Sequence, residues 1–92
     1  MADIIRYPEA EPGLRILKGD VYFVFSLHAV ARMAEREVPL EYVISAIQHG
    51  RFKKFGNNMV RITKDFKKGR LACVGFQFSE NACKLLTIEW MP

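Results

Sequence analysis

The sequence predicts an α+β fold in which two consecutive helices pack on one face of an antiparallel β-meander. Two observations carry this prediction. Apolar residues recur at helical spacing from Ser26 to about Gly50, whereas from Arg51 onward they alternate with polar residues and are interrupted by short turns. A strand-prone segment precedes the helical stretch, so the expected order is strand, helix, helix and four further strands.

The composition is that of one globular domain. Half of the 92 residues are hydrophobic and 26% are charged, which excludes a disordered chain. We expect an N-terminal arm at residues 1–13 and a single domain at residues 14–92, because the first segment contains Pro8 and Pro12 and shows little periodicity. The formal net charge of +4 suits an anionic partner such as RNA, DNA or an acidic protein.

Several classes of site are excluded by the residues present. Cys73 and Cys83 match no metal-ligand spacing and make no disulfide framework, so we expect both to be packing residues. No metal-ligand cluster or glycine-rich phosphate loop occurs, and we therefore expect no cofactor. The chain also lacks an apolar run of membrane-spanning length and a signal-peptide pattern, which predicts a cytoplasmic protein without a membrane partner.

Turn and cap residues set the expected boundaries of the first three elements. Two β-prone runs, residues 14–17 and 21–25, flank Lys18-Gly19-Asp20, which predicts a hairpin. The first helix is predicted over residues 27–37, with Ser26 as its N-cap.

The second helix is predicted over residues 39–49, because Pro39 suits a helix start. Gly50 is expected to end it in a left-handed conformation. Turn residues then separate four predicted strands, at residues 52–55, 59–66, 71–78 and 83–90.

The same periodicities predict which side chains are buried. On the first helix the apolar side is expected to contain Leu27, Val30, Ala31, Met33, Ala34 and Val38. On the sheet the buried face is expected to contain Val60, Ile62, Ala72, Val74, Phe76, Phe78, Leu86, Ile88 and Trp90. The opposite sheet face is then mixed and polar, with Arg61, Thr63, Cys73, Gly75, Gln77, Thr87 and Glu89.

A basic stripe on the first helix is the main candidate site. His28, Arg32 and Arg36 follow one another at i, i+4 and i+8, with Glu35 beside them. Several of these groups could contact one phosphate. An ordinary solvated helix face has the same composition, so spacing alone does not decide between the two interpretations.

The stretch from Phe25 to Arg36, followed by Val38 and a helix ending at Gly50, resembles a small bacterial family of domains of unknown function. That family carries H-A-x-x-R-M-x-x-R near its first helix, which matches residues 28–36, and it ends in a strand with a threonine, which Thr87 matches. The family is grouped with BrnT-type and RelE/ParE-type toxins in the barnase and colicin ribonuclease fold group. The resemblance therefore implies a RelE/barnase-like arrangement and a toxin-type endoribonuclease.

Metal-free RNA cleavage needs an acid, a base and cations that stabilise charge on the phosphate. We expect the catalytic residues to be His28, Arg32, Arg36, Arg61 and Thr87, gathered around one phosphate. The flanking RNA backbone is expected to contact Lys53, Lys54, Lys64, Lys67, Lys68 and Arg70. RNA and a small acidic antitoxin-like protein are the expected partners.

Two other classes of function stay open. The same basic residues suit a non-enzymatic module that binds nucleic acid or protein, and they also suit a structural domain whose charges keep it in solution. His28 is also interpretable as a surface or capping residue and Glu35 as an ion-pair partner of Arg32 or Arg36, and His49 is assigned to the last turn of the second helix rather than to a site.

Overall fold

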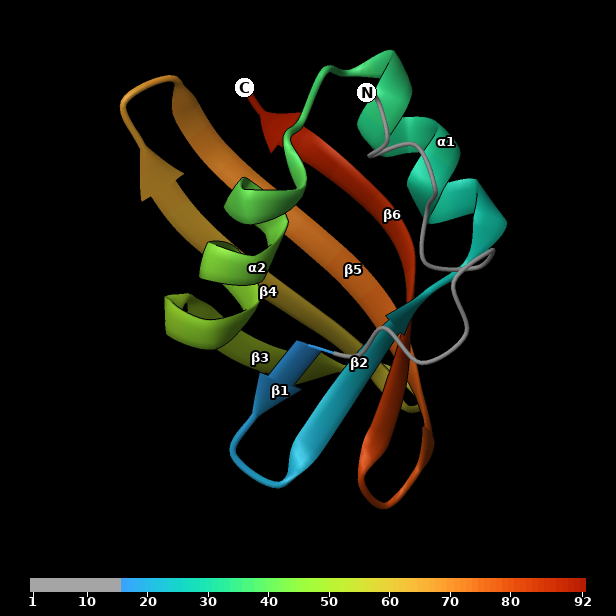
Figure 1. The fold of residues 1–92 in the computed structure, drawn as a ribbon. Helices are drawn as coiled ribbons and strands as arrows, with labels where there is room; N and C mark the ends of the chain where they lie inside the picture. Colours follow the sequence, from blue (N-terminus) through green and yellow to red (C-terminus); the bar gives the residue numbers. More distant parts are fainter. Residues whose placement is uncertain (1–15) are drawn as a thin grey trace.

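The computed structural model describes residues 16–92, which form an α+β fold of two helices and a curled, mixed sheet of six strands (Figure 1). The predicted arm at residues 1–13, together with Leu14 and Arg15, lies outside the described residues. The elements are, in chain order, β1 (Ile16–Lys18), β2 (Val21–Phe25), α1 (Leu27–Glu35), α2 (Leu40–His49), β3 (Arg51–Phe55), β4 (Met59–Phe66), β5 (Gly69–Ser79) and β6 (Ala82–Met91).

The sheet has the strand order β1-β2-β6-β5-β4-β3. Strands β3 to β6 form the predicted antiparallel meander, and β1 and β2 form the predicted hairpin. The sequence did not indicate where this hairpin attaches. β2 pairs in parallel with the first half of β6, through residues 22–25 and 82–85, and this pairing makes the sheet mixed.

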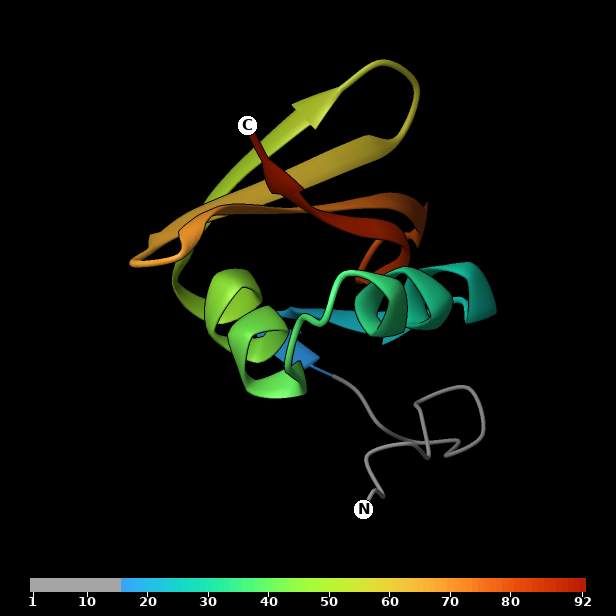
Figure 2. The ribbon, with the colours of Figure 1, turned by 90° about the horizontal axis from the view of Figure 1, so that it is seen from above.

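Both helices lie on the same side of the sheet, which we call the inner face (Figure 2). α1 packs against β6 and β2, whereas α2 packs against β1, β4 and β5. Among the described residues, no helix is long and apolar enough to cross a membrane.

Helix α1 begins as predicted but is rotated from the expected orientation. The Ser26 hydroxyl accepts a hydrogen bond from the Ala29 amide at 3.0 Å, and the helix ends two residues early, at Glu35. Its buried residues are Ala29, Val30 and Met33, because these face β6 and β2. Three residues expected on its apolar side are instead exposed, namely Leu27 (72% exposed), Ala31 and Ala34.

Gly50 ends α2 as predicted, but the expected left-handed conformation is wrong. Its φ of −83° and ψ of −177° are those of extended backbone. Glycine is required here for close approach, because a Cβ would lie 2.3 Å from the Ala46 carbonyl oxygen and 2.6 Å from the Thr63 carbonyl oxygen. The residue therefore lets the chain pass tightly between α2 and β4.

The buried core confirms the predicted inward direction of Val60, Ile62 and Ile88 but corrects that of β5. Ile62, Cys73 and Ile88 are paired across three strands and are all fully buried. Val74, Phe76 and Phe78 therefore face outward, Ala72 is buried as predicted, and Leu71, Cys73 and Gly75 are buried as well. Both alternating sets of β5 contain apolar residues, so its sequence alone does not define the inner face.

A bulge in β6 explains the remaining shift. Val74 pairs with Thr87, but Gly75 pairs with Leu85, which leaves Leu86 as an extra residue. Leu85 and Ile88 can then both point inward, and Leu86 lines an outward-facing hollow.

The two cysteines are packing residues in the core. Burial raises the pKa of the Cys73 thiol to about 12 and also raises that of Cys83. Neither thiol is therefore activated as a thiolate at neutral pH.

We expect Gly50→Ala to lower the free energy of unfolding by about 3 kcal/mol, because the new methyl group would clash with two carbonyl oxygens. Urea denaturation measures this loss. Gly19→Ala is the matched control, because a Cβ added at Gly19 would have no atom within 4 Å. The substitution is opposed by the backbone φ of +61°, which should lower the free energy of unfolding by about 1 kcal/mol. Equal losses in the two variants would contradict the assigned role of Gly50.

Candidate nucleic-acid interface

The side of the sheet opposite the helices, which we call the outer face, carries two neighbouring rows of side chains. Within residues 16–92 no helix packs on this face (Figure 2). Each row crosses the strands in the order β3, β4, β5 and β6. One row consists of Phe55, Met59, Phe76 and Lys84, and the other consists of Lys53, Arg61, Val74 and Thr87. The outer face therefore combines aromatic and cationic side chains.

The aromatic side chains of the outer face are exposed. Phe55 is 43% exposed, Phe76 38% and Phe78 51%. Phe76 and Phe78 also line an apolar hollow of about 410 Å³, together with Val24, Lys84 and Leu86. Exposed aromatic rings on an open sheet are the surfaces on which unpaired nucleic-acid bases stack.

The cations beside these rings are available to a ligand. Lys53, Arg61 and Lys84 are exposed, and none of them forms an ion pair or hydrogen bond in the part of the chain that the structure describes. Guanidinium and ammonium groups in this state can neutralise backbone phosphates and release their counterions.

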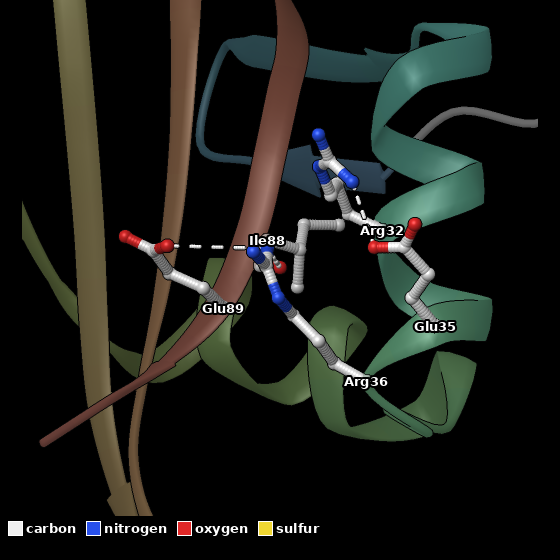
Figure 3. A network of polar contacts seen from close by, with 5 residues as sticks. All are labelled: Arg32, Glu35, Arg36, Ile88 and Glu89. Carbon is white, nitrogen blue, oxygen red and sulfur yellow. Dashed lines mark hydrogen bonds and ion pairs between the residues drawn. The ribbon is translucent and has the colours of Figure 1, made fainter.

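A separate network of polar side chains lies where α1 meets β6 (Figure 3). Arg36 Nη1 donates a hydrogen bond of 2.9 Å to the Ile88 carbonyl and lies 3.9 Å from Glu89 Oε1. Arg32 Nη1 donates to Glu35 Oε1 at 2.7 Å. Both arginines extend from α1 toward β6, and both already have partners within the protein.

The five predicted catalytic residues fall into two groups. Arg61 and Thr87 share one row of the outer face, with Val74 between them, so their Cα atoms lie about 10 Å apart. His28 and Arg32 lie on α1, where His28 is exposed, and Arg36 is the residue that directly follows the helix. Strands β5 and β6 separate Arg61 from α1, and no hydrogen bond joins His28 to Arg61 in residues 16–92.

The six basic residues predicted to contact RNA have different surroundings. Lys53 lies on the outer face, Lys67 is exposed in the β4–β5 turn, and Lys54 lines a polar hollow beside Phe78. The other three already contact a side chain. Lys64 Nζ lies 4.8 Å from the centroid of the Phe66 ring, Lys68 Nζ lies 5.5 Å from that of Trp90, and Arg70 binds Asp65.

Another hollow, of about 390 Å³, lies between the end of α2 and β4. It is lined by His49, Gly50, Arg51, Thr63, Lys64, Asp65 and Arg70. Arg70 holds Asp65 through hydrogen bonds of 2.6 and 3.3 Å. This hydrogen-bonded pair, with the nearby charges of Arg51 and Lys64, lowers the pKa of the Asp65 carboxyl below its usual value.

Sequence reasoning missed two parts of these surfaces. Phe76 and Phe78 were expected in the core, because alternation along β5 does not distinguish its faces. The hollow at the end of α2 was missed because His49, Arg51 and Asp65 come from three elements that only the fold brings together. The signal available in the sequence for this hollow was Arg51, a basic residue that directly follows Gly50.

Across residues 16–92 there is no group of three His, Cys, Asp or Glu residues that could hold a metal ion. In comparisons of the chain with known proteins, no family model, no curated protein and no solved structure matches it.

Arg36 and Arg32 offer a matched pair for testing the contact between α1 and β6. We expect Arg36→Ala to lower the free energy of unfolding by about 1.5 kcal/mol, because a partly buried Ile88 carbonyl loses a charged donor. Arg32→Ala removes only an exposed ion pair and should cost less than about 0.5 kcal/mol. Thermal and urea unfolding of both variants measure the difference, and equal costs would show that Arg36 does not hold α1 against β6.

Proposed function

We propose that this protein binds RNA through the outer face of its sheet. The observation that carries the proposal is a surface on which three exposed phenylalanines, Phe55, Phe76 and Phe78, neighbour three cations, Lys53, Arg61 and Lys84, that have no ion-pair partner within residues 16–92. Phosphates are attracted to the cations and unpaired bases stack on the rings, so one strand can use both kinds of group.

Single-stranded RNA fits this surface better than a duplex or an acidic protein. Bases in a duplex are already stacked on one another and cannot reach aromatic side chains. An acidic protein, including the antitoxin-like partner that the sequence suggests, would use the cations but gain less from the rings. The apolar hollow beside Phe76 and Phe78 supports the choice, because it offers space next to the stacking surface.

Charge and stacking can be separated by salt dependence. We expect Arg61→Ala to weaken binding of a single-stranded RNA and to reduce the slope of log affinity against log salt by about one unit, since one phosphate contact is lost. We expect Phe76→Ala to weaken binding about tenfold without changing that slope, because stacking releases no counterion. Fluorescence anisotropy at several salt concentrations measures both.

Lys18→Ala is the matched control for charge. It removes one positive charge near α2, where Lys18 Nζ donates a hydrogen bond to the Gln48 carbonyl at 3.4 Å, away from the outer face. Its affinity should stay close to wild type. The proposed surface would be contradicted if Lys18→Ala and Arg61→Ala weakened RNA binding equally. It would also be contradicted if Phe76→Ala left RNA binding unchanged.

A second candidate function is metal-independent cleavage of the bound RNA. One observation favours it: the Arg36 guanidinium reaches the backbone of β6, the strand that carries Thr87. The resemblance to RelE- and barnase-like toxins supports the same activity, and with it a cytoplasmic protein and a small acidic antitoxin-like partner. In this proposal His28 transfers the proton and the neighbouring Arg32 and Arg36 stabilise charge on the phosphate, whereas Arg61, on the opposite face of the sheet, only helps to bind the RNA.

Cleavage is tested with purified protein and labelled RNA in the presence of a metal chelator. If His28 transfers a proton, His28→Ala should lower the rate at least a hundredfold while binding affinity is unchanged, because proton transfer contributes about 10²–10⁴-fold to rate. Wild-type protein that binds RNA without cleaving it would reject the second function and leave the first intact.

A further inference from the structure

The hollow of about 390 Å³ at the end of α2 lies at one corner of the outer face. β3 pairs with β4 only as far as Arg51 and Thr63, so residues 64–66 of β4 extend beyond the neighbouring strand. Arg51 and Thr63 lie two residues along their strands from Lys53 and Arg61, which is about 7 Å. A strand that crosses the outer face and contacts Arg61 therefore has this hollow within reach of its next groups.

The charges around the hollow are unbalanced. Arg51, Lys64 and Arg70 face one carboxylate, Asp65, which leaves two net positive charges when His49 is neutral. Arg70 is engaged by Asp65. Within the described residues, the side chains of Arg51 and His49 form no hydrogen bond or ion pair, so their donors are free.

The positive charges around the hollow also act on the Asp65 carboxyl. The lowered pKa of its carboxyl comes first from the hydrogen bond with Arg70 and then from the charges of Arg70, Arg51 and Lys64. Groups that stabilise this carboxylate would stabilise a second anion in the same space. The volume of the hollow is many times the roughly 30 Å³ that one water molecule occupies in liquid water, so a phosphate group and its bound waters fit.

We propose that this hollow binds a phosphate monoester, and that its ligand is the terminal phosphate of an RNA strand lying on the outer face. The inference rests on the proposed function for the source of the phosphate, but the anion site itself does not. A terminal phosphate carries up to two negative charges, which matches the two net positive charges of the lining, whereas an internal diester carries one. The Arg51 guanidinium and the Thr63 hydroxyl are the donors, and the His49 ring N–H adds a further one, while Lys64, whose ammonium lies over the Phe66 ring, contributes its charge.

The experiment compares three versions of one single-stranded RNA, with a 5′-phosphate, with a 3′-phosphate and with neither. We expect one phosphorylated version to bind about fivefold to tenfold more tightly than the unphosphorylated strand, as for a gained charge-assisted contact. Arg51→Ala should abolish this difference. Lys53→Ala, two residues along the same strand, should weaken all three strands equally and preserve the difference. Circular dichroism of both variants, with Arg51→Gln as a milder second change, checks that the fold is retained.

A parallel measurement uses inorganic phosphate alone. Its addition should shift the amide resonances of Gly50 and Arg51 in wild-type protein and not in Arg51→Ala. Equal binding of all three RNA strands would overturn the terminal-phosphate inference while leaving the proposed function standing. Binding of none of the strands would overturn the proposed function, and the RNA source with it. Inorganic phosphate would then decide the anion site: shifts lost in Arg51→Ala support it, and an absence of shifts overturns it.

Discussion

The two edges of β6 determine how the rest of the fold is arranged. β5 pairs along one edge from residue 82 to residue 91, whereas β2 pairs along the other only as far as Leu85. Unpaired backbone groups in a protein interior cost about as much free energy as a lost hydrogen bond, so the remaining edge needs other partners. The two ends of α1 provide them: the Ser26 amide donates to the Leu85 carbonyl at 3.0 Å, and Arg36 donates to the Ile88 carbonyl. α1 is thereby held alongside β6.

This arrangement leaves one face of the sheet without a helix in the part of the chain that the structure describes. With α1 beside β6 and α2 against β1, β4 and β5, the described helices cover the inner face, and the residues between the buried positions form the outer one. Phe55, Phe76 and Arg61 are exposed there because Val60 and Ile62 are buried on the other side. The same packing brings the end of α2 against β4 at Gly50, where the cationic hollow forms. The candidate RNA surface and the candidate phosphate site therefore follow from one packing arrangement.

The sequence predicted the elements well and their faces less well. Local signals such as the Ser26 cap, the turn at residues 56–58 and the change of period near Gly50 depend on near neighbours, which the sequence contains. The outward direction of Phe76 depends on the register of β5 with β4, and that of Leu86 depends on the bulge opposite Gly75; both are tertiary features. The parallel pairing of β2 with β6 joins segments about 60 residues apart and has no local signal. For the same reason the stripe of α1 was recognisable, whereas its separation from Arg61 by two strands was not.

The most direct test of the central claim is an NMR titration that follows phenylalanine ring resonances while a single-stranded RNA is added. Stacked bases shift the signals of rings they contact. We predict large shifts for Phe76 and Phe78 on the outer face and small ones for Phe52 and Phe66, which pack against the core on the inner face. Large shifts at Phe52 and Phe66, with Phe76 and Phe78 unchanged, would contradict the assignment of the outer face as the RNA surface.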